Sequence, residues 1–270
     1  MNTEDQNRKA DNDEGARPNI LYSNMLDQMR YFEALEFIKE KDVLDIACGV
    51  GWGSYLMSKS GAKTVKGIDL SENALMCAEK YYKLKNINYI LGDALRIPLD
   101  SESIDVIVSL ETFEHIENVS SFVNELHRVA RNNSLLILST PNGYCCKNDI
   151  NRKPENPYHF QEYLRKDIEN IFSQDKWEIV SYKGQNPMKK DSEDIKKYRR
   201  FIFLYWKFKK YELKYGLLVK IPFFIIRRFI LAKTLYEPAY KDSCMPKDIL
   251  DGNEPSTHFY IFKCIKLETK

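Results

Sequence analysis

The sequence lacks the cysteine and histidine spacings of a structural metal site. Its 270 residues include six cysteines, with no C-x-x-C pair, and only four histidines. Most of the cysteines lie in apolar or strand-like stretches, which is typical of reduced thiols in a protein core. No cluster of acids and histidines stands apart from the strand-end residues described below, so we expect no metal centre.

Long uncharged apolar runs are also missing. No window reaches the ~18 to 20 residues that a membrane-spanning helix requires, and no apolar leader is present at the N-terminus. Residues 1–18 are polar and are predicted to form a disordered tail. These features predict a cytoplasmic protein.

Neither sign of charge is in large excess. The chain has 41 Lys and Arg against 39 Asp and Glu, a net charge of +2, so we expect no nucleic-acid partner. The hydrophobic fraction of 43% is enough for a full core, and the length suits one α/β domain with an elaboration.

Apolar runs alternate with helical stretches as far as residue 182. Strands separated by helices are typical of βαβ units in a parallel sheet, and burial of both faces explains why these strands are apolar throughout. We expect a mostly parallel, seven-stranded sheet in one α/β domain, formed by residues 19–183 and 256–270. The predicted strands are 43–47, 64–69, 87–91, 104–109, 135–139, 177–182 and 257–267, and the predicted helices are 20–39, 52–59, 71–84, 119–131 and 161–173.

The alternation is interrupted by a late insertion, residues 184–255, before the last strand. Within it, residues 195–235 contain twelve Lys and Arg, one acid (Glu212) and eleven aromatic residues. Three interpretations remain open. The segment forms a helical lid or dimer contact, a membrane-surface helix that serves a lipid-linked acceptor, or a basic site for phosphate-bearing acceptors such as nucleotide sugars or, less favoured, RNA.

The stretch VLDIACGVGWGS, residues 43–54, predicts a nucleotide-binding turn. It joins a strand to a helix through Gly49, Gly51 and Gly53, and a turn without Cβ atoms lets a ligand lie against the backbone. The alternate glycine spacing differs from the dinucleotide fingerprint G-x-G-x-x-G, and the turn has no phosphate-binding lysine. A ligand with an amino acid end and an adenosine end, but without phosphates, suits it better.

Acidic residues lie within or just beyond four predicted strands. Asp45 lies in the first strand, Asp69 ends the second, Asp93 follows the third, and Glu111 and His115 follow the fourth. In an open α/β sheet, ligands bind beyond the carboxyl ends of the strands. Packing alone does not explain this set, because each buried acid requires a partner.

Four stretches occur in the order typical of class I S-adenosylmethionine-dependent methyltransferases, which the chain resembles over residues 30–182. These stretches are VLDIACGVGWGS, GIDLSENAL, GDALRIPLDSESIDVIVSLETFEHI and NSLLILSTPN. The resemblance implies a Rossmann-like doubly wound fold with S-adenosylmethionine as cofactor and S-adenosylhomocysteine as product. Arg30-Tyr31, DIACGVGWGS, and STPN followed by NPYHFQEY are most similar to the bacterial small-molecule (type 11) branch associated with polysaccharide and glycan biosynthesis.

The resemblance also implies the cofactor-binding residues. Asp45 organises the turn and faces the methionine amino group, Asp69 accepts the ribose hydroxyls, and Leu70 packs on the adenine. The implied set is Arg30, Tyr31, Asp45, Ala47, Gly49, Gly51, Asp69, Leu70, Asp93, Ala94 and Leu110. One departure is Ala47, which replaces the first glycine of many relatives.

Methyl transfer to a hydroxyl also needs a group that removes a proton. We favour His159 as this base, with His115 as the alternative and Glu111 or Glu114 as the supporting carboxylate. The two remaining histidines are expected in a surface helix (His127) and in the last strand (His258).

The expected reaction is O-methylation of a small-molecule or glycan-linked acceptor. We favour a sugar hydroxyl, or a phosphate or phosphoramidate group, in surface polysaccharide biosynthesis. Methylation of a quinone or another aromatic is an alternative, and so is a cofactor-binding or interaction protein without catalysis. A homodimer and peripheral contact with the inner membrane face through residues 195–235 are further expectations.

Overall fold

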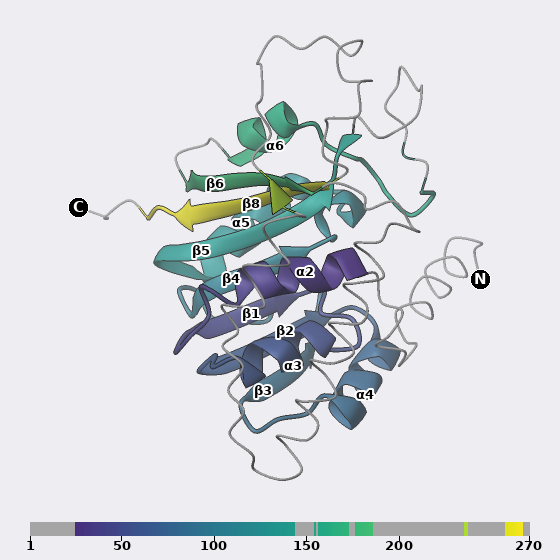
Figure 1. The fold of residues 1–270 in the computed structure, drawn as a ribbon, viewed down its shortest axis with the longest axis vertical. Helices are drawn as coiled ribbons and strands as arrows, with labels where there is room; N and C mark the ends of the chain where they lie inside the picture. The colour runs from purple at the N-terminus through teal and green to yellow at the C-terminus, as the bar shows by residue number, and fades with distance from the viewer. Residues whose placement is uncertain are drawn as a thin grey trace. The chain divides into compact units, whose positions relative to one another are not determined.

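The structure is a computed structural model that describes residues 25–143, 154, 156–172, 176–185, 235–236 and 257–266 (Figure 1). The chain divides into two compact units, residues 1–183 with 257–270 and residues 184–256. The predicted tail, residues 1–18, and all of the basic segment 195–235 except Leu235 lie outside the described residues. No described helix is long and apolar enough to cross a membrane.

The described elements follow the predicted alternation of strands and helices. In chain order they are α2 (Met25–Ala34), β1 (Asp42–Ile46), α3 (Trp52–Lys59), β2 (Thr64–Asp69), α4 (Glu72–Tyr81), β3 (Ile87–Leu91), β4 (Ile104–Leu110), the 3₁₀ helix η1 (Phe113–His115), α5 (Val119–Val129), β5 (Ala130–Pro141), α6 (Arg165–Phe172), β6 (Trp177–Gln185), β7 (Leu235–Tyr236) and β8 (Thr257–Cys264). Local chemistry sets several of the boundaries. The Ser71 hydroxyl, for example, accepts a hydrogen bond from the Ala74 amide and caps α4 as predicted.

One sheet has the strand order β3-β2-β1-β4-β5-β8-β6-β7. The pairs β1–β2, β1–β4, β2–β3 and β4–β5 are parallel, and β5–β8 is antiparallel. The mostly parallel, doubly wound sheet is therefore confirmed, with an added two-residue strand, β7, that pairs with residues 184–185 inside the second unit. The strand order reverses between β1 and β4, which is where an open α/β sheet binds its ligand.

The core lies between this sheet and the helices packed on it. Figure 1 shows α2 lying across the near face of the sheet, where it packs against α3 and β4. Leu44, Ile107 and Leu136 of the central strands are fully buried together with Phe122 and Leu126 of α5. Burial of each such side chain contributes about 1.5 to 3 kcal/mol. This packing positions the carboxyl ends of β1 and β4.

The helix predicted over 161–173 begins later, at Arg165, because the preceding residues bond to other segments. The Phe160 amide donates to the Glu114 carbonyl at 2.8 Å, and the Gly143 amide donates to the Tyr163 carbonyl at 2.9 Å. These bonds hold residues 156–164 as a loop against η1 and the end of β5. His159 is thereby brought beside His115.

His127 lies in the predicted helix, α5, but its side chain is more enclosed than expected for a surface residue. His127 is half-buried, its Nε2 lies 3.1 Å from the Ile265 carbonyl oxygen, and its ring meets the Trp177 ring edge-on at 6.0 Å. Burial lowers the pKa of this imidazole. The residue connects α5 to the end of β8.

Candidate functional site

A buried carboxylate at the end of β1 holds the glycine turn. Asp45 is 1% exposed, and its two oxygens accept hydrogen bonds from the Ser54 hydroxyl at 2.6 Å and the Tyr31 hydroxyl at 3.0 Å. Burial raises the pKa of Asp45 to about 7, although both hydrogen bonds act in the opposite direction. Asp45 therefore connects β1 to α3 and α2.

A second carboxylate, at the end of β2, organises the backbone opposite the turn. Asp69 accepts hydrogen bonds from the Gly49 amide at 2.7 Å and the Ser71 amide at 2.8 Å, one on each oxygen. Burial raises the pKa of Asp69. Each carboxylate oxygen keeps acceptor capacity beyond these bonds, so two ligand hydroxyls can still bind to it.

The glycines of the turn serve different purposes. A Cβ on Gly49 would meet no atom within 4 Å, so the turn borders open space at this residue. A Cβ on Gly51 would lie 2.5 Å from the Tyr89 hydroxyl and 2.6 Å from Ala78 Cβ. A Cβ on Gly53 would likewise clash, in this case with the Tyr31 ring. Gly49 thus borders the candidate ligand space, whereas Gly51 and Gly53 allow close packing.

Ala47 occupies a backbone conformation that favours glycine. Its φ is +58°, in the left-handed region, and its side chain is exposed. This conformation accounts for the glycine that the resemblance places at this position.

The residues after β2 and β3 border the same end of the sheet. Leu70 is 67% exposed, which leaves an apolar side chain in solvent next to the Asp69 carboxylate. Asp93 accepts a hydrogen bond from the Leu95 amide at 2.8 Å, and Ala94 is buried. The exposed side chain of Leu70 can cover one face of a planar ligand.

Arg30 and Glu111 form an ion pair between α2 and the end of β4. Arg30 is 2% exposed, and its Nη1 lies 3.4 Å from Glu111 Oε2. The other Glu111 oxygen accepts a hydrogen bond from the Ser139 hydroxyl at 2.8 Å. Glu111 follows Leu110, the last residue of β4, and its carboxylate contacts Arg30 and Ser139. None of these bonds joins Glu111 to a histidine.

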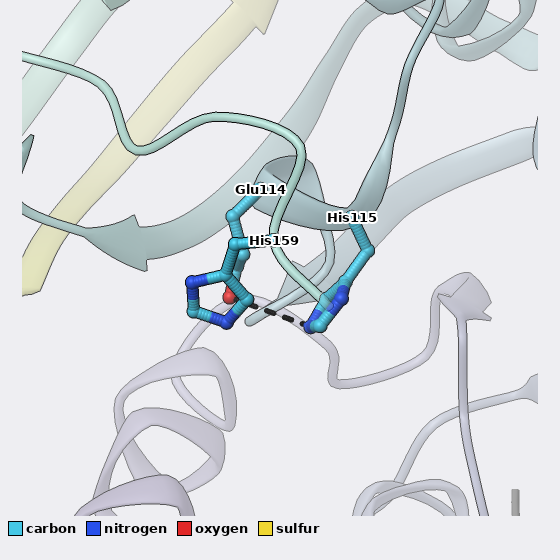
Figure 2. Close-up of side chains that lie close together, drawn as sticks. All are labelled: Glu114, His115 and His159. Atoms are coloured by element: carbon cyan, nitrogen blue, oxygen red, sulfur yellow. Dashed lines mark ion pairs between the residues drawn. The ribbon is translucent and has the colours of Figure 1, made fainter. Parts of the chain in front are cut away.

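Two histidines and a buried glutamate converge beside η1 (Figure 2). The rings of His115 and His159 are perpendicular, with centroids 4.8 Å apart. Glu114 is 1% exposed, and its Oε2 accepts a hydrogen bond from the Thr140 hydroxyl at 2.8 Å. Burial raises the pKa of the Glu114 carboxyl well above its ordinary value, and the nearby Glu111 carboxylate raises it further.

The carboxylate that orients His159 is Glu162, which the sequence analysis missed. His159 Nδ1 lies 2.8 Å from Glu162 Oε1, and both side chains are about 90% buried, with exposures of 11% and 10%. The signal that could have identified Glu162 is its spacing of three residues from His159 within NPYHFQEY. Such spacing brings two side chains together in a tight turn, and sequence alone does not show the turn.

The hydrogen bonds around His159 define its tautomer. Asn156 Oδ1 accepts a hydrogen bond from the Tyr158 amide at 3.0 Å, so the amide nitrogen of Asn156 is the atom that faces His159 Nε2, at 3.0 Å. An amide nitrogen can only donate, and therefore Nε2 is the acceptor. The imidazole proton is on Nδ1, where it is donated to Glu162.

Comparisons with known proteins show which families the chain is similar to. A family model described as "Methyltransferase domain" matches residues 44–138. A probable S-adenosylmethionine-dependent methyltransferase of Mycolicibacterium smegmatis is 29% identical over 144 residues, 53% of this chain and 54% of that protein. The ubiquinone biosynthesis O-methyltransferase of Neisseria meningitidis is 27% identical over 146 residues, 52% of this chain and 58% of that protein.

Solved structures extend the likeness in fold. An S-adenosylmethionine-dependent methyltransferase from Mesorhizobium loti has a TM-score of 0.55 and 16% identity, and the match covers 88% of this chain and 99% of that one. At this identity the likeness concerns the fold. The chain spans about half the length of the curated relatives that it matches.

Replacement of Ala47 by Gly should stabilise the chain. The left-handed conformation costs an alanine about 1 to 2 kcal/mol, which glycine avoids. Glycine also gives the unfolded chain more conformational freedom, which offsets part of this stabilisation. We expect the free energy of unfolding to increase by about 0.5 to 1 kcal/mol in urea denaturation. The control is Ala78→Gly within α4, which should lower it by about 1 kcal/mol or more. An unchanged or lowered stability for Ala47→Gly would contradict the strain at this position.

The raised pKa of Asp45 makes a pH-dependent contribution to stability. Between the unfolded value of 3.8 and the folded value of about 7, the folded chain retains a proton that the unfolded chain has lost. Stability therefore falls as the pH rises through this window, by about 1.4 kcal/mol per unit. We expect the free energy of unfolding of Asp45→Asn, relative to the unchanged chain, to rise by about 2 to 3 kcal/mol between pH 5 and pH 8. Urea denaturation of both proteins without cofactor measures this difference, and parallel pH profiles would refute the shift.

Proposed function

We propose that this chain transfers a methyl group from S-adenosylmethionine to a small-molecule or glycan-linked acceptor, because residues 44–138 match a methyltransferase domain model and about half of the chain is similar to a probable S-adenosylmethionine-dependent methyltransferase. The favoured acceptor atom is an oxygen. It belongs to a sugar hydroxyl, or to a phosphate or phosphoramidate group, in surface polysaccharide biosynthesis.

The described residues fit the cofactor. The space beside Gly49 leaves room for a ligand against the turn, and the Asp69 carboxylate keeps acceptor capacity on both oxygens for a ribose diol. The exposed Leu70 supplies an apolar surface for an adenine ring. When bound, the cofactor would supply an electrophilic methyl group on a sulfonium.

Two residues of α2 support this binding indirectly. Tyr31 donates its hydroxyl proton to Asp45, and its ring packs on Gly53 and against Trp52. Arg30 is held by Glu111. Tyr31 would orient Asp45 toward the amino group of the cofactor, and Arg30 would face the carboxylate of the cofactor. Asp93, Ala94 and the Leu110 backbone complete the expected contacts.

The observation that best supports an oxygen acceptor is the paired His159 and Glu162. A histidine that donates Nδ1–H to a carboxylate presents the Nε2 lone pair, which is the form of a general base. His159 would take the acceptor hydroxyl proton at Nε2, where the acceptor would replace the Asn156 amide, and Glu162 would stabilise the resulting imidazolium. His115, whose ring is 4.8 Å away, would line the acceptor position.

A second candidate is O-methylation of a quinone or another aromatic acceptor. The observation that favours it is the similarity to the Neisseria meningitidis protein, whose name includes ubiquinone biosynthesis. An interaction protein without catalysis remains a third candidate, and a complete set of Asp45, Gly49 and Asp69 is evidence against it.

The partners and location of the protein remain predictions. The basic segment 195–235 is expected to contact a dimer partner, an anionic membrane surface or a phosphate-bearing acceptor. Liposome sedimentation of the chain with and without this segment separates the membrane interpretation from the others, because only a surface-bound helix makes sedimentation depend on the segment.

Binding of the cofactor product is predicted to depend on Asp69. Calorimetry with S-adenosylhomocysteine should give saturable binding by the unchanged chain. Because hydrogen bonds to a charged group are lost, Asp69→Ala should weaken the affinity by at least about 10-fold. Asp100→Ala, at an exposed position, is the matched control and should bind normally. No binding by the unchanged chain at millimolar ligand would refute the cofactor assignment.

Release of S-adenosylhomocysteine in the presence of an acceptor panel tests the reaction. Nucleotide sugars and sugar phosphates represent the favoured class, and catechols and hydroquinones the aromatic class. With a responding acceptor, His159→Ala should lower kcat by about 100- to 10,000-fold. Glu162→Gln should also lower it, while both variants keep their affinity for S-adenosylhomocysteine. His127→Ala is the control, and near-full turnover by His159→Ala would exclude His159 as the base.

A further inference from the structure

We propose that Glu114, His115 and His159 bind one divalent transition-metal ion of the zinc type. One ligand atom from each of these side chains lies within 4.8 Å of the other two, and His115 Nε2 is 4.0 Å from Glu114 Oε1. Two atoms that share one ion lie about 3 to 4.3 Å apart, because each bond is about 2.0 to 2.2 Å long. Small side-chain rotations therefore suffice to close the site.

Figure 2 shows the two imidazoles and the Glu114 carboxylate pointing toward one another from two segments of the chain. Glu114 and His115 come from η1, and His159 comes from the loop before α6. The hydrogen bond from the Phe160 amide to the Glu114 carbonyl joins these segments through their main chains. The two segments that carry the ligands are thus joined before any ion binds, and the ion would replace the Asn156 amide at His159 Nε2.

Both histidines have the tautomer that a metal requires. His115 Nδ1 lies 3.1 Å from the Tyr158 carbonyl oxygen, which can only accept, so the proton is on Nδ1 and the lone pair is on Nε2. His159 donates its own Nδ1 proton to Glu162. Metal-binding histidines nearly always donate their other ring N–H to a carbonyl or a carboxylate in this way. A single general base does not explain why both histidines donate Nδ1–H to an oxygen and keep the lone pair on Nε2.

The ligand chemistry favours zinc over magnesium. Two imidazole nitrogens and one carboxylate suit zinc and its first-row neighbours, whereas magnesium prefers oxygen ligands and retains its water. Three protein ligands also leave at least one position open, as in catalytic sites. The His115 side chain is 35% exposed, so an ion can enter from solvent on that side.

The ion would deepen the proposed function, and this part of the inference rests on it. An acceptor hydroxyl bound to the ion loses its proton to solvent more readily, because the cation lowers the pKa of a coordinated oxygen. The oxygen keeps the electron pair that forms the new O–CH₃ bond as the C–S bond breaks. In this form His159 is a ligand, since its Nε2 lone pair is used by the ion.

Calorimetry on the full chain after treatment with a chelator tests the binding. Zn²⁺ should bind at one ion per chain, and Mg²⁺ should bind at least about 100-fold more weakly. His115→Ala, His159→Ala and Glu114→Gln should each weaken Zn²⁺ binding by at least about 10-fold. Asn156→Ala, which removes the amide that donates to His159 Nε2, should not weaken it. The matched control is His127→Ala, which should bind Zn²⁺ normally.

Co²⁺ substitution excludes binding by the cysteines. The absorption spectrum of the Co²⁺-loaded chain should show d–d bands without a thiolate charge-transfer band in the near ultraviolet. Far-ultraviolet circular dichroism should show that each variant is folded. If Glu114→Gln does not fold, His159→Ala serves in its place, because that side chain lies in a loop. A lack of stoichiometric Zn²⁺ binding, a thiolate band, or undiminished binding by His115→Ala and His159→Ala would overturn the proposal.

Binding of S-adenosylhomocysteine and methyl transfer are measured in the same samples. Suppose that S-adenosylhomocysteine binds and His159→Ala abolishes methyl transfer, but neither the unchanged chain nor any variant binds Zn²⁺. The metal site is then refuted, and His159 remains the proposed base. If Zn²⁺ binds as expected but no acceptor is methylated, the metal site stands and the proposed function fails.

Discussion

The buried carboxylate of Asp45 is the interaction on which the rest of the site depends. At 1% exposure it requires hydrogen-bond donors, and it obtains them from Tyr31 in α2 and Ser54 in α3. These bonds position the glycine turn on one side and α2 on the other. Arg30, the neighbour of Tyr31 in α2, has its guanidinium against Glu111, which follows β4. One buried acid thus connects the cofactor side of the site to the end of β4, from which the histidine cluster begins.

The two halves of the site are built in different ways. The cofactor half consists of backbone and short-range contacts, such as the Gly49 amide on Asp69 and the Ser71 amide on the same carboxylate. The histidine cluster, which we propose faces the acceptor, is assembled from side chains of η1 and of the loop before α6, held together by the bond between Phe160 and Glu114. The first arrangement presents a fixed surface to a constant cofactor.

Much of the fold could be predicted, because its determinants are local. Apolar runs such as 104–109 must be strands buried on both faces, and Ser71 caps α4 through its own side chain. Predictions that depend on distant contacts were less complete. The helix expected from 161 begins at Arg165, since the preceding residues bond to η1 and β5. Gly51, whose contact with the cofactor stays a prediction, also has a packing requirement from Tyr89 and Ala78.

The sequence by itself determined the type of sheet, the glycine turn and the acids at the strand ends, because each follows from periodicity or from neighbours a few residues apart. Only the tertiary structure decided which carboxylate orients His159 and which residues surround it. His115 and His159 are 44 residues apart (159 − 115) in the chain, so no spacing rule relates them. Their juxtaposition arises from hydrogen bonds between two loops. The sequence spacing therefore predicts no metal centre, whereas the folded chain brings two imidazoles and a buried carboxyl together.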